Sequence, residues 1–162
     1  MAAKLPVILQ TEMTECGLAC LAMIARFHGH DIDLNVLRRK HLVSMTGASL
    51  KSVIAIADDL QLSSRPLRLD MDHLEKLQLP AMLHWDLNHY VVLKSIKGDR
   101  AEIIDPEEGP RAVRERFFTV KIRHDSGLSL AQCAVKSSIY LGEKYSGFSS
   151  NALPCLCYVS RS

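Results

Sequence analysis

Residues 89–105 read HYVVLKSIKGDRAEIID, which predicts two antiparallel strands joined by a short turn. The first half of this stretch is rich in β-branched and apolar side chains, which pack well on a pleated sheet. The letters KGDR at 97–100 are typical of a turn, so the last five residues are expected to return as the partner strand. Residues 81–85 and 111–122 predict further strands on either side. The second half of the chain is therefore expected to form an antiparallel sheet.

The first half of the chain has the periodicity of helices instead. Residues 14–28, TECGLACLAMIARFH, predict a helix with Thr14 as its N-cap and Gly29 as its stop. Apolar residues recur at the i, i+3, i+4 and i+7 positions of one helical face. They are Leu18, Leu21, Ala22 and Ala25.

Two further helices are expected, one over 33–40 with Asp33 as its cap and one over 49–61 with Ser49 as its cap. Each begins with a small polar side chain that can accept a hydrogen bond from a free backbone N–H of the first turn. Two minor elements are expected before the sheet, a strand at 65–69 and a helix at 70–77.

Helices that precede a sheet, rather than alternate with its strands, predict an α+β domain with N-terminal helices packed on an antiparallel β-sheet. The length of 162 residues fits one domain, and a hydrophobic content of 48% is enough to bury a core. The formal net charge of +2 gives no reason to expect nucleic acid as a partner. The sequence has neither a signal peptide nor a run of about 18 apolar residues, so we expect a cytoplasmic protein.

Cys16 is the first candidate for a functional residue, because it falls in the first turn of an expected helix. There the aligned backbone dipoles and free N–H groups favour a thiolate, the form of cysteine that attacks a carbonyl carbon. Taken alone, a cysteine on a helix is more often a small core residue. Cys20, one turn deeper, is the better candidate for the core. The five cysteines are odd in number and widely spread, unlike a disulfide framework.

His89 and Asp105 are candidate partners of that thiolate, because the expected hairpin brings its two ends together. An aspartate beside a histidine fixes the tautomer of the imidazole and stabilises the imidazolium that forms with a thiolate. Ordinary polarity at strand ends explains either residue equally well. Gln10, six residues before Cys16, adds a side-chain amide that can donate to a developing oxyanion, although a lone glutamine is usually a surface residue.

Together these residues follow the order glutamine, cysteine, histidine, aspartate, which is the order of papain-type cysteine peptidases. Rival sites have weaker support. His84 and His89 are five residues apart, which puts them on different faces of a strand or helix, so a structural metal is not expected. Cys16 and Cys20 lack the two-residue spacing of a thioredoxin-type redox motif. Acyl transfer to an amine uses the same three groups and stays open.

Three motifs resemble the peptidase domains fused to bacteriocin ABC exporters, in particular the colicin V and microcin branch. The first is LQTE at 9–12, followed by ECGLACLAMI at 15–24. The second is LHWDLNHYVVL at 83–93. The third is IDP at 104–106, followed by Gly109.

This resemblance extends over residues 5–122 and implies a papain-like cysteine peptidase fold. It implies that Cys16 is the nucleophile and His89 the general base and acid. It likewise implies that Asp105 orients the imidazole and that Gln10 helps to form the oxyanion hole.

The resemblance also implies a substrate and partners. Such domains cleave precursor peptides after a double-glycine motif, Gly-Gly or Gly-Ala, at the end of a helical leader. The membrane and ATPase domains of an ABC exporter are the implied partners, which places the domain at the inner face of the plasma membrane. No metal or organic cofactor is expected in the peptidase, and ATP is expected only at the exporter's ATPase domain. The alternative is a catalytically inactive module that binds the leader peptide.

Residues 1–122 are therefore interpreted as the peptidase domain and residues 123–162 as an atypical tail. The tail has weak periodicity and many serines, and it does not resemble a linker to a membrane span. We interpret it as disordered or as the product of a frameshift, a hypothesis that reading the downstream DNA in the other frames would test.

Overall fold

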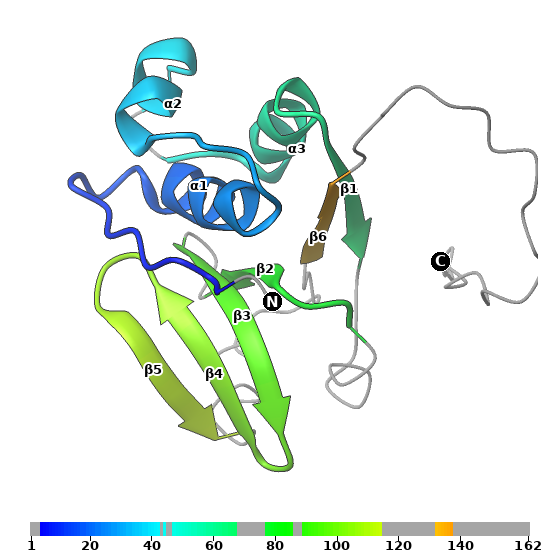
Figure 1. Ribbon diagram of the computed structural model, residues 1–162. Coiled ribbons are helices and arrows are strands. Elements are labelled where there is room, and N and C mark those ends of the chain that lie inside the picture. The colour runs from blue at the N-terminus through cyan, green and yellow to red at the C-terminus, as the bar shows by residue number, and fades with distance from the viewer. Residues whose placement is uncertain are drawn as a thin grey trace, which may run out of the picture.

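In the computed structural model, the described residues form three helices on one face of a six-stranded antiparallel sheet (Figure 1). The predicted α+β class, with N-terminal helices packed on the sheet, is confirmed. No helix within the described ranges is long and apolar enough to cross a bilayer. The helices are α1 (Cys16–Phe27), α2 (Leu34–Lys40) and α3 (Leu50–Asp59). The structure describes residues 4–42, 44, 47–67, 77–85, 89–114 and 132–137.

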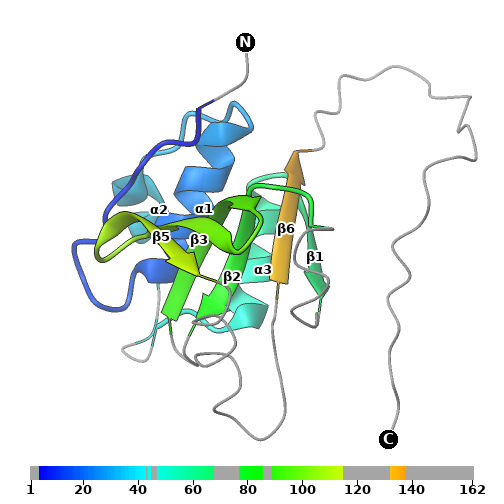
Figure 2. The same cartoon turned by 90° about the horizontal axis from the view of Figure 1, so that it is seen from below.

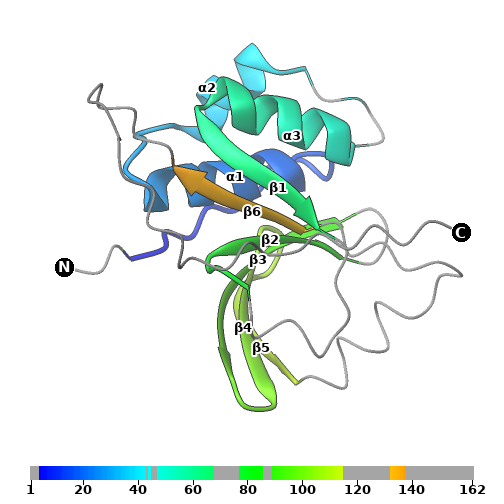
Figure 3. The same cartoon turned by 90° about the vertical axis from the view of Figure 1, so that its right-hand side faces the viewer.

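The strands of the sheet follow the order β1-β6-β2-β3-β4-β5, and every neighbouring pair is antiparallel. Helix α1 lies over β2 and β3, whereas α3 lies over β1 (Figures 1 and 3). The β4–β5 hairpin extends away from the helices at the other edge (Figure 3). The strands are β1 (Leu62–Leu67), β2 (Ala81–Trp85), β3 (His89–Lys97), β4 (Arg100–Asp105), β5 (Gly109–Arg114) and β6 (Gln132–Ser137).

Both faces of the central strands are buried, because side chains alternate along a strand and each face has its own core. The face toward the helices contributes Met82, Tyr90, Val92 and Ile104. The opposite face contributes Ala81, Leu83, Trp85, Val91, Leu93, Ala101 and Ile103.

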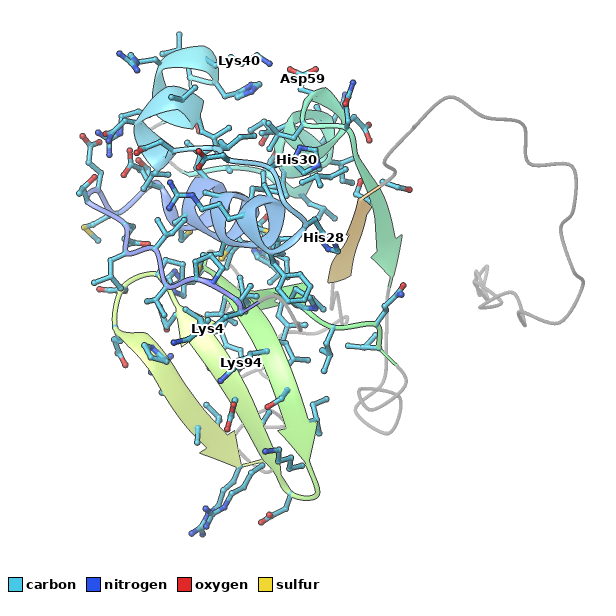
Figure 4. The ribbon with its side chains drawn as sticks, in the orientation of Figure 1. Lys4, His28, His30, Lys40, Asp59 and Lys94 are labelled. Carbon is cyan, nitrogen blue, oxygen red and sulfur yellow. The ribbon has the colours of Figure 1, made fainter. Side chains whose placement is uncertain are left out.

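Helix α1 is the centre of the packing, and residues 16–25 are all buried. It is enclosed by α2, α3 and the sheet, so the apolar stripe expected on one face extends round most of the helix. The other two helices meet at their C-terminal ends, where Lys40 Nζ lies 3.9 Å from Asp59 Oδ2 (Figure 4). This surface ion pair contributes little stability because both side chains are half exposed.

Most of the predicted helix ends are confirmed by their capping contacts. Asp33 Oδ1 accepts from the Asn35 backbone N–H at 2.8 Å, and Ser49 Oγ accepts from the Ser52 N–H at 3.1 Å. Gly29 follows α1 with a φ of +89°, the left-handed conformation that ends many helices.

The start of α1 differs from the prediction. Residues 11–14 form a turn, and the Glu15 N–H donates to the Glu12 carbonyl at 3.1 Å. This turn delays the helix until Cys16 and puts Glu15 in the N-cap position, so the prediction of Thr14 as the cap is wrong.

Strand β1 also begins earlier than the predicted 65–69. Helix α3 ends at Asp59, and Gln61 reverses the chain with a φ of 57°, so the backbone is already extended at Leu62. The predicted helix at 70–77 lies outside the described residues except for its last position.

Strand β5 begins at Gly109, two residues before the predicted 111–122, because Gly109 has a φ of +91° and closes a short turn after β4. Positions 115–122 lie outside the described residues. The sequence predicted no strand within 123–162, yet Gln132–Ser137 forms β6 between β1 and β2. The interpretation of the rest of that tail remains a prediction.

Gly17 has no room for a side chain, which leads to a prediction about stability. A Cβ built at this position would lie 3.0 Å from Ala48 Cβ and close to Val53 and Tyr90. We expect Gly17→Val to lower the free energy of unfolding by about 1–3 kcal/mol, because its Cβ would crowd Ala48 and the two methyl groups beyond it would meet Val53 and Tyr90. Urea denaturation measures this change. Lys51→Val, at an exposed site in the first turn of α3, is the control and should shift it by less than about 0.5 kcal/mol.

Candidate active site

Cys16 is the first residue of α1, and its side chain is buried to 2% exposure. The N-cap residue, Glu15, makes no side-chain hydrogen bond to the first turn of the helix. The free N–H groups of that turn are therefore left to favour negative charge at the thiol and on a bound carbonyl oxygen. The prediction that Cys16 lies in the first turn of a helix is confirmed.

His89 and Asp105 meet as the hairpin predicted. His89 begins β3, Asp105 ends β4, and His89 Nε2 lies 2.8 Å from Asp105 Oδ1. The imidazole also interacts with the Cys16 side chain, which has the largest influence on its pKa. Because Asp105 occupies Nε2, Nδ1 is the nitrogen left for the thiol. The structure thus joins thiol, imidazole and carboxylate in one chain of contacts.

Asp105 is held by several donors although it is only 2% exposed. The Glu107 N–H donates to Oδ1 at 3.0 Å, and Arg111 Nη2 donates to Oδ2 at 2.6 Å. Burial acts to raise the pKa of Asp105, but the Glu107 N–H, His89 and Arg111 lower it below its usual value. The carboxylate is therefore ionised and fixed when it faces His89.

The pKa of His89 is raised from 6.5 to about 9. The interaction with Cys16 is the largest cause, burial opposes it, and the hydrogen bond and charge of Asp105 add to the rise. The imidazolium is consequently the stable form at neutral pH, and its positive charge lies beside the Cys16 thiol. A cysteine peptidase of the papain type rests in this state before substrate binds.

Gln10 reaches the site through its backbone rather than through a side-chain contact with the triad. Its N–H donates to the carbonyl oxygen of Pro106, the residue after Asp105, at 2.8 Å. The segment that carries Gln10 therefore runs beside the turn between β4 and β5 (Figure 2). Its side-chain oxygen Oε1 is buried and has no hydrogen-bond partner among the described residues.

The rival sites considered from the sequence find no support in the described part of the chain. Cys20 is fully buried, as predicted for a core residue, and burial together with the nearby Cys16 and Asp105 raises the pKa of its thiol well above the usual value. The ring of His84 contacts that of Tyr90, with centroids 4.8 Å apart. The described residues contain no group of three or more potential metal ligands.

Sequence reasoning missed three charged residues around the site. Arg111 clamps Asp105, and Glu15 forms a buried ion pair with Arg38. Asp105 pairs with Gly109, and Arg111 lies two residues further along β5. Side chains two residues apart on a strand point to the same face, and this alternation could have placed Arg111 on the side of Asp105. Nothing in the sequence pattern alone links Glu15 to α2, because that contact depends on how the helices pack.

The raised pKa of His89 predicts the alkaline limb of the activity profile. Imidazolium is present below a pKa of about 9 and is lost above it, so kcat/KM for peptide cleavage should fall as the pH rises through about 9. Asp105→Asn keeps an oxygen that can accept from His89 but removes a negative charge that raises this pKa, so the limb should move to lower pH and kcat should fall. Glu102→Gln, on the exposed side of β4, should leave the profile unchanged. An alkaline limb at the same pH in Asp105→Asn would contradict this assignment.

A cysteine at the start of a helix, beside a histidine and an aspartate from the antiparallel sheet on which that helix packs, is the arrangement of the papain-like cysteine peptidases. The solved structures of similar proteins agree. A double glycine motif protease from an AMS/PCAT transporter, crystallised with a leader peptide, has a TM-score of 0.70 and 32% identity, over 82% of this chain and 90% of that one. The peptidase domain of Streptococcus ComA has the same fold, with a TM-score of 0.71 and 18% identity over 82% and 98% of the two chains.

The chain belongs to the Peptidase C39 family, whose model matches residues 4–121. It is similar to the colicin V secretion/processing ATP-binding protein CvaB of Escherichia coli, with 48% identity over 120 residues. That match covers 72% of this chain and 17% of CvaB, so the chain spans about a sixth of the length of this relative. The predicted resemblance to the peptidase domains of bacteriocin and microcin exporters is confirmed.

Proposed function

We propose that this chain is an endopeptidase that removes the leader from a bacteriocin-type precursor by cutting after a double-glycine motif, Gly-Gly or Gly-Ala. The observation that carries the proposal is the contact of His89 with both Cys16 and Asp105, at the N-terminus of a buried helix. These three groups supply the nucleophile, the proton carrier and the orienting charge that hydrolysis of a peptide bond requires.

In the first half of the reaction, the Cys16 thiolate attacks the carbonyl carbon of the residue before the scissile bond. The carbonyl oxygen gains the negative charge, and the amide of Gln10 with the free N–H groups of α1 stabilises it. His89 then gives its proton to the leaving nitrogen, the C–N bond breaks, and an acyl thioester remains on Cys16. Asp105 stabilises the imidazolium until that proton leaves.

In the second half, neutral His89 takes a proton from water, and the hydroxide that forms attacks the thioester carbon. Collapse of the tetrahedral intermediate breaks the C–S bond, releases the leader with its new carboxylate and restores the thiolate–imidazolium pair. The chemistry is complete with side chains and water, so we propose that the peptidase uses neither a metal nor an organic cofactor.

The substrate and partners are proposed from the relatives. CvaB is named as a secretion and processing protein that binds ATP, and the protease from the AMS/PCAT transporter was solved with a leader peptide. We propose that this chain acts likewise on a double-glycine leader at the cytoplasmic face of the membrane. There it works beside the membrane and ATPase domains of an ABC exporter, and ATP binds only to the exporter's ATPase domain.

Mass spectrometry of a synthetic precursor incubated with the protein tests this proposal. One cut directly after the Gly-Gly pair is expected. A precursor with leucine in place of the second glycine should not be cut, because the proposed specificity for small residues excludes bulky side chains. Folded protein that binds the precursor without cutting it would instead indicate a binding module. Transfer of the leader to an added amine, seen as a product of different mass, would indicate acyl transfer.

A further inference from the structure

A buried ion pair lies directly beside the nucleophile. Glu15 directly precedes Cys16 in the chain, and its carboxylate is only 3% exposed. Arg38 of α2 binds both of its oxygens, through Nε to Oε1 and through Nη2 to Oε2 at 2.9 Å. A two-pronged contact of this kind fixes the carboxylate in orientation as well as in position.

The same carboxylate holds the turn that precedes α1. Glu15 Oε2 accepts from the Thr11 hydroxyl at 2.9 Å and from the backbone N–H groups of Thr11 and Glu12, each at 3.3 Å. The Thr11 hydroxyl in turn accepts from Arg38 Nη2. One carboxylate therefore ties two backbone donors of the loop to the helix that carries the nucleophile.

The backbone around Gln10 is held by hydrogen bonds on two neighbouring residues. Its own N–H is bound to Pro106, and the next residue along the chain is bound to Glu15. The buried side-chain oxygen of Gln10 has no hydrogen-bond partner within the described ranges. The two anchors therefore fix the backbone from which the Gln10 side chain extends.

We infer that Glu15 and Arg38 are positioning residues, whose ion pair fixes the Thr11–Glu12 turn and so aims the Gln10 amide at the carbonyl oxygen under attack. The inference rests on the proposed function, because it assigns these two residues a part in the same cleavage. The inference assigns neither residue a contact with the substrate, because both act through Gln10.

Arginine is needed here for charge as well as for shape. Burial acts to raise the pKa of Glu15, but the hydrogen bonds from Arg38 and Thr11 lower it below its usual value, so the ion pair persists at neutral pH. A lysine keeps the charge but cannot bind both oxygens in the same way.

A double-mutant cycle on cleavage of the Gly-Gly precursor tests the inference. Gln10→Ala should lower kcat by about a hundredfold to a thousandfold, the effect of losing an oxyanion donor. Arg38→Met should lower kcat by about tenfold to a hundredfold with KM nearly unchanged. The kcat of Arg38→Lys should lie between that of Arg38→Met and that of the wild type. In the Gln10→Ala background, Arg38→Met should cause no further loss. Arg39→Met, at the exposed neighbouring position, should match the wild type.

The outcomes separate cleanly. Multiplying losses in the double variant, or a loss confined to KM, would show that Arg38 does not act through Gln10 and would overturn the inference. Circular dichroism checks that each variant is folded. If Arg38→Met is unfolded, Thr11→Val takes its place, and its smaller loss must likewise vanish in the Gln10→Ala background. Absence of cleavage by the wild-type protein would be a failure of the proposed function itself, and the inference would fall with it.

Discussion

Cys16→Ala should abolish cleavage of a double-glycine precursor, with a fall in kcat of at least about a thousandfold. The thioester cannot form without the sulfur, and the remaining groups of the site supply only a small rate. Affinity for the leader should stay within about twofold, because a leader is recognised over a surface much larger than the thiol. Mass spectrometry follows the cleavage, and fluorescence anisotropy of a labelled leader follows the binding.

Cys20→Ala is the matched control, since it removes the other described cysteine of the same helix. Cys20 is fully buried, so this change should lower stability while leaving kcat close to that of the wild type. Cleavage by folded Cys16→Ala at the wild-type rate would rule out Cys16 as the nucleophile.

His89→Ala should have an effect of similar size on turnover, and it should also slow the alkylation of Cys16. At about pH 6 the imidazolium beside Cys16 is fully formed in the wild type, because the pKa of His89 is about 9. Removing this charge leaves the thiolate without its partner, so iodoacetamide should react more slowly at that pH. The rate of carbamidomethylation, measured on the Cys16 peptide, reports this directly.

His30→Ala provides the control for a general effect of histidine removal. His30 follows the C-terminal end of α1, the end opposite Cys16 (Figure 4). Its substitution should change neither the turnover rate nor the rate at which Cys16 is alkylated. An unchanged alkylation rate in His89→Ala, together with lost turnover, would mean that the helix N-terminus alone sustains the thiolate.

The sequence allowed the elements of the fold to be predicted where local signals were strong. The hairpin of β3 and β4 was predictable because β-branched residues flank a turn at 97–100. The caps Asp33 and Ser49 were predictable because each side chain accepts a hydrogen bond from a backbone N–H only two or three residues further along the chain. The place of β6 between β1 and β2 was not predictable, because pairing between distant strands leaves no local pattern.

The site likewise combines contacts that local sequence patterns predict with contacts that depend on how distant elements pack. Contact between His89 and Asp105 followed from the register of one hairpin, and the place of Cys16 followed from the helix that it opens. The N-cap was predicted wrongly as Thr14, because the turn before α1 depends on the distant Arg38 through Glu15. Long-range ion pairs are set by how helices pack, which the sequence pattern does not record.

The bond from the Gln10 N–H to the Pro106 carbonyl has a consequence for biosynthesis. It joins the first described segment of the chain to the residue that follows β4, so Gln10 and Asp105 come together only after nearly the whole domain has left the ribosome. Long-range closures of this kind form late in folding. A nascent chain therefore carries Cys16 without its activating partners, and proteolytic activity should appear only when synthesis has passed the hairpin that contains Asp105.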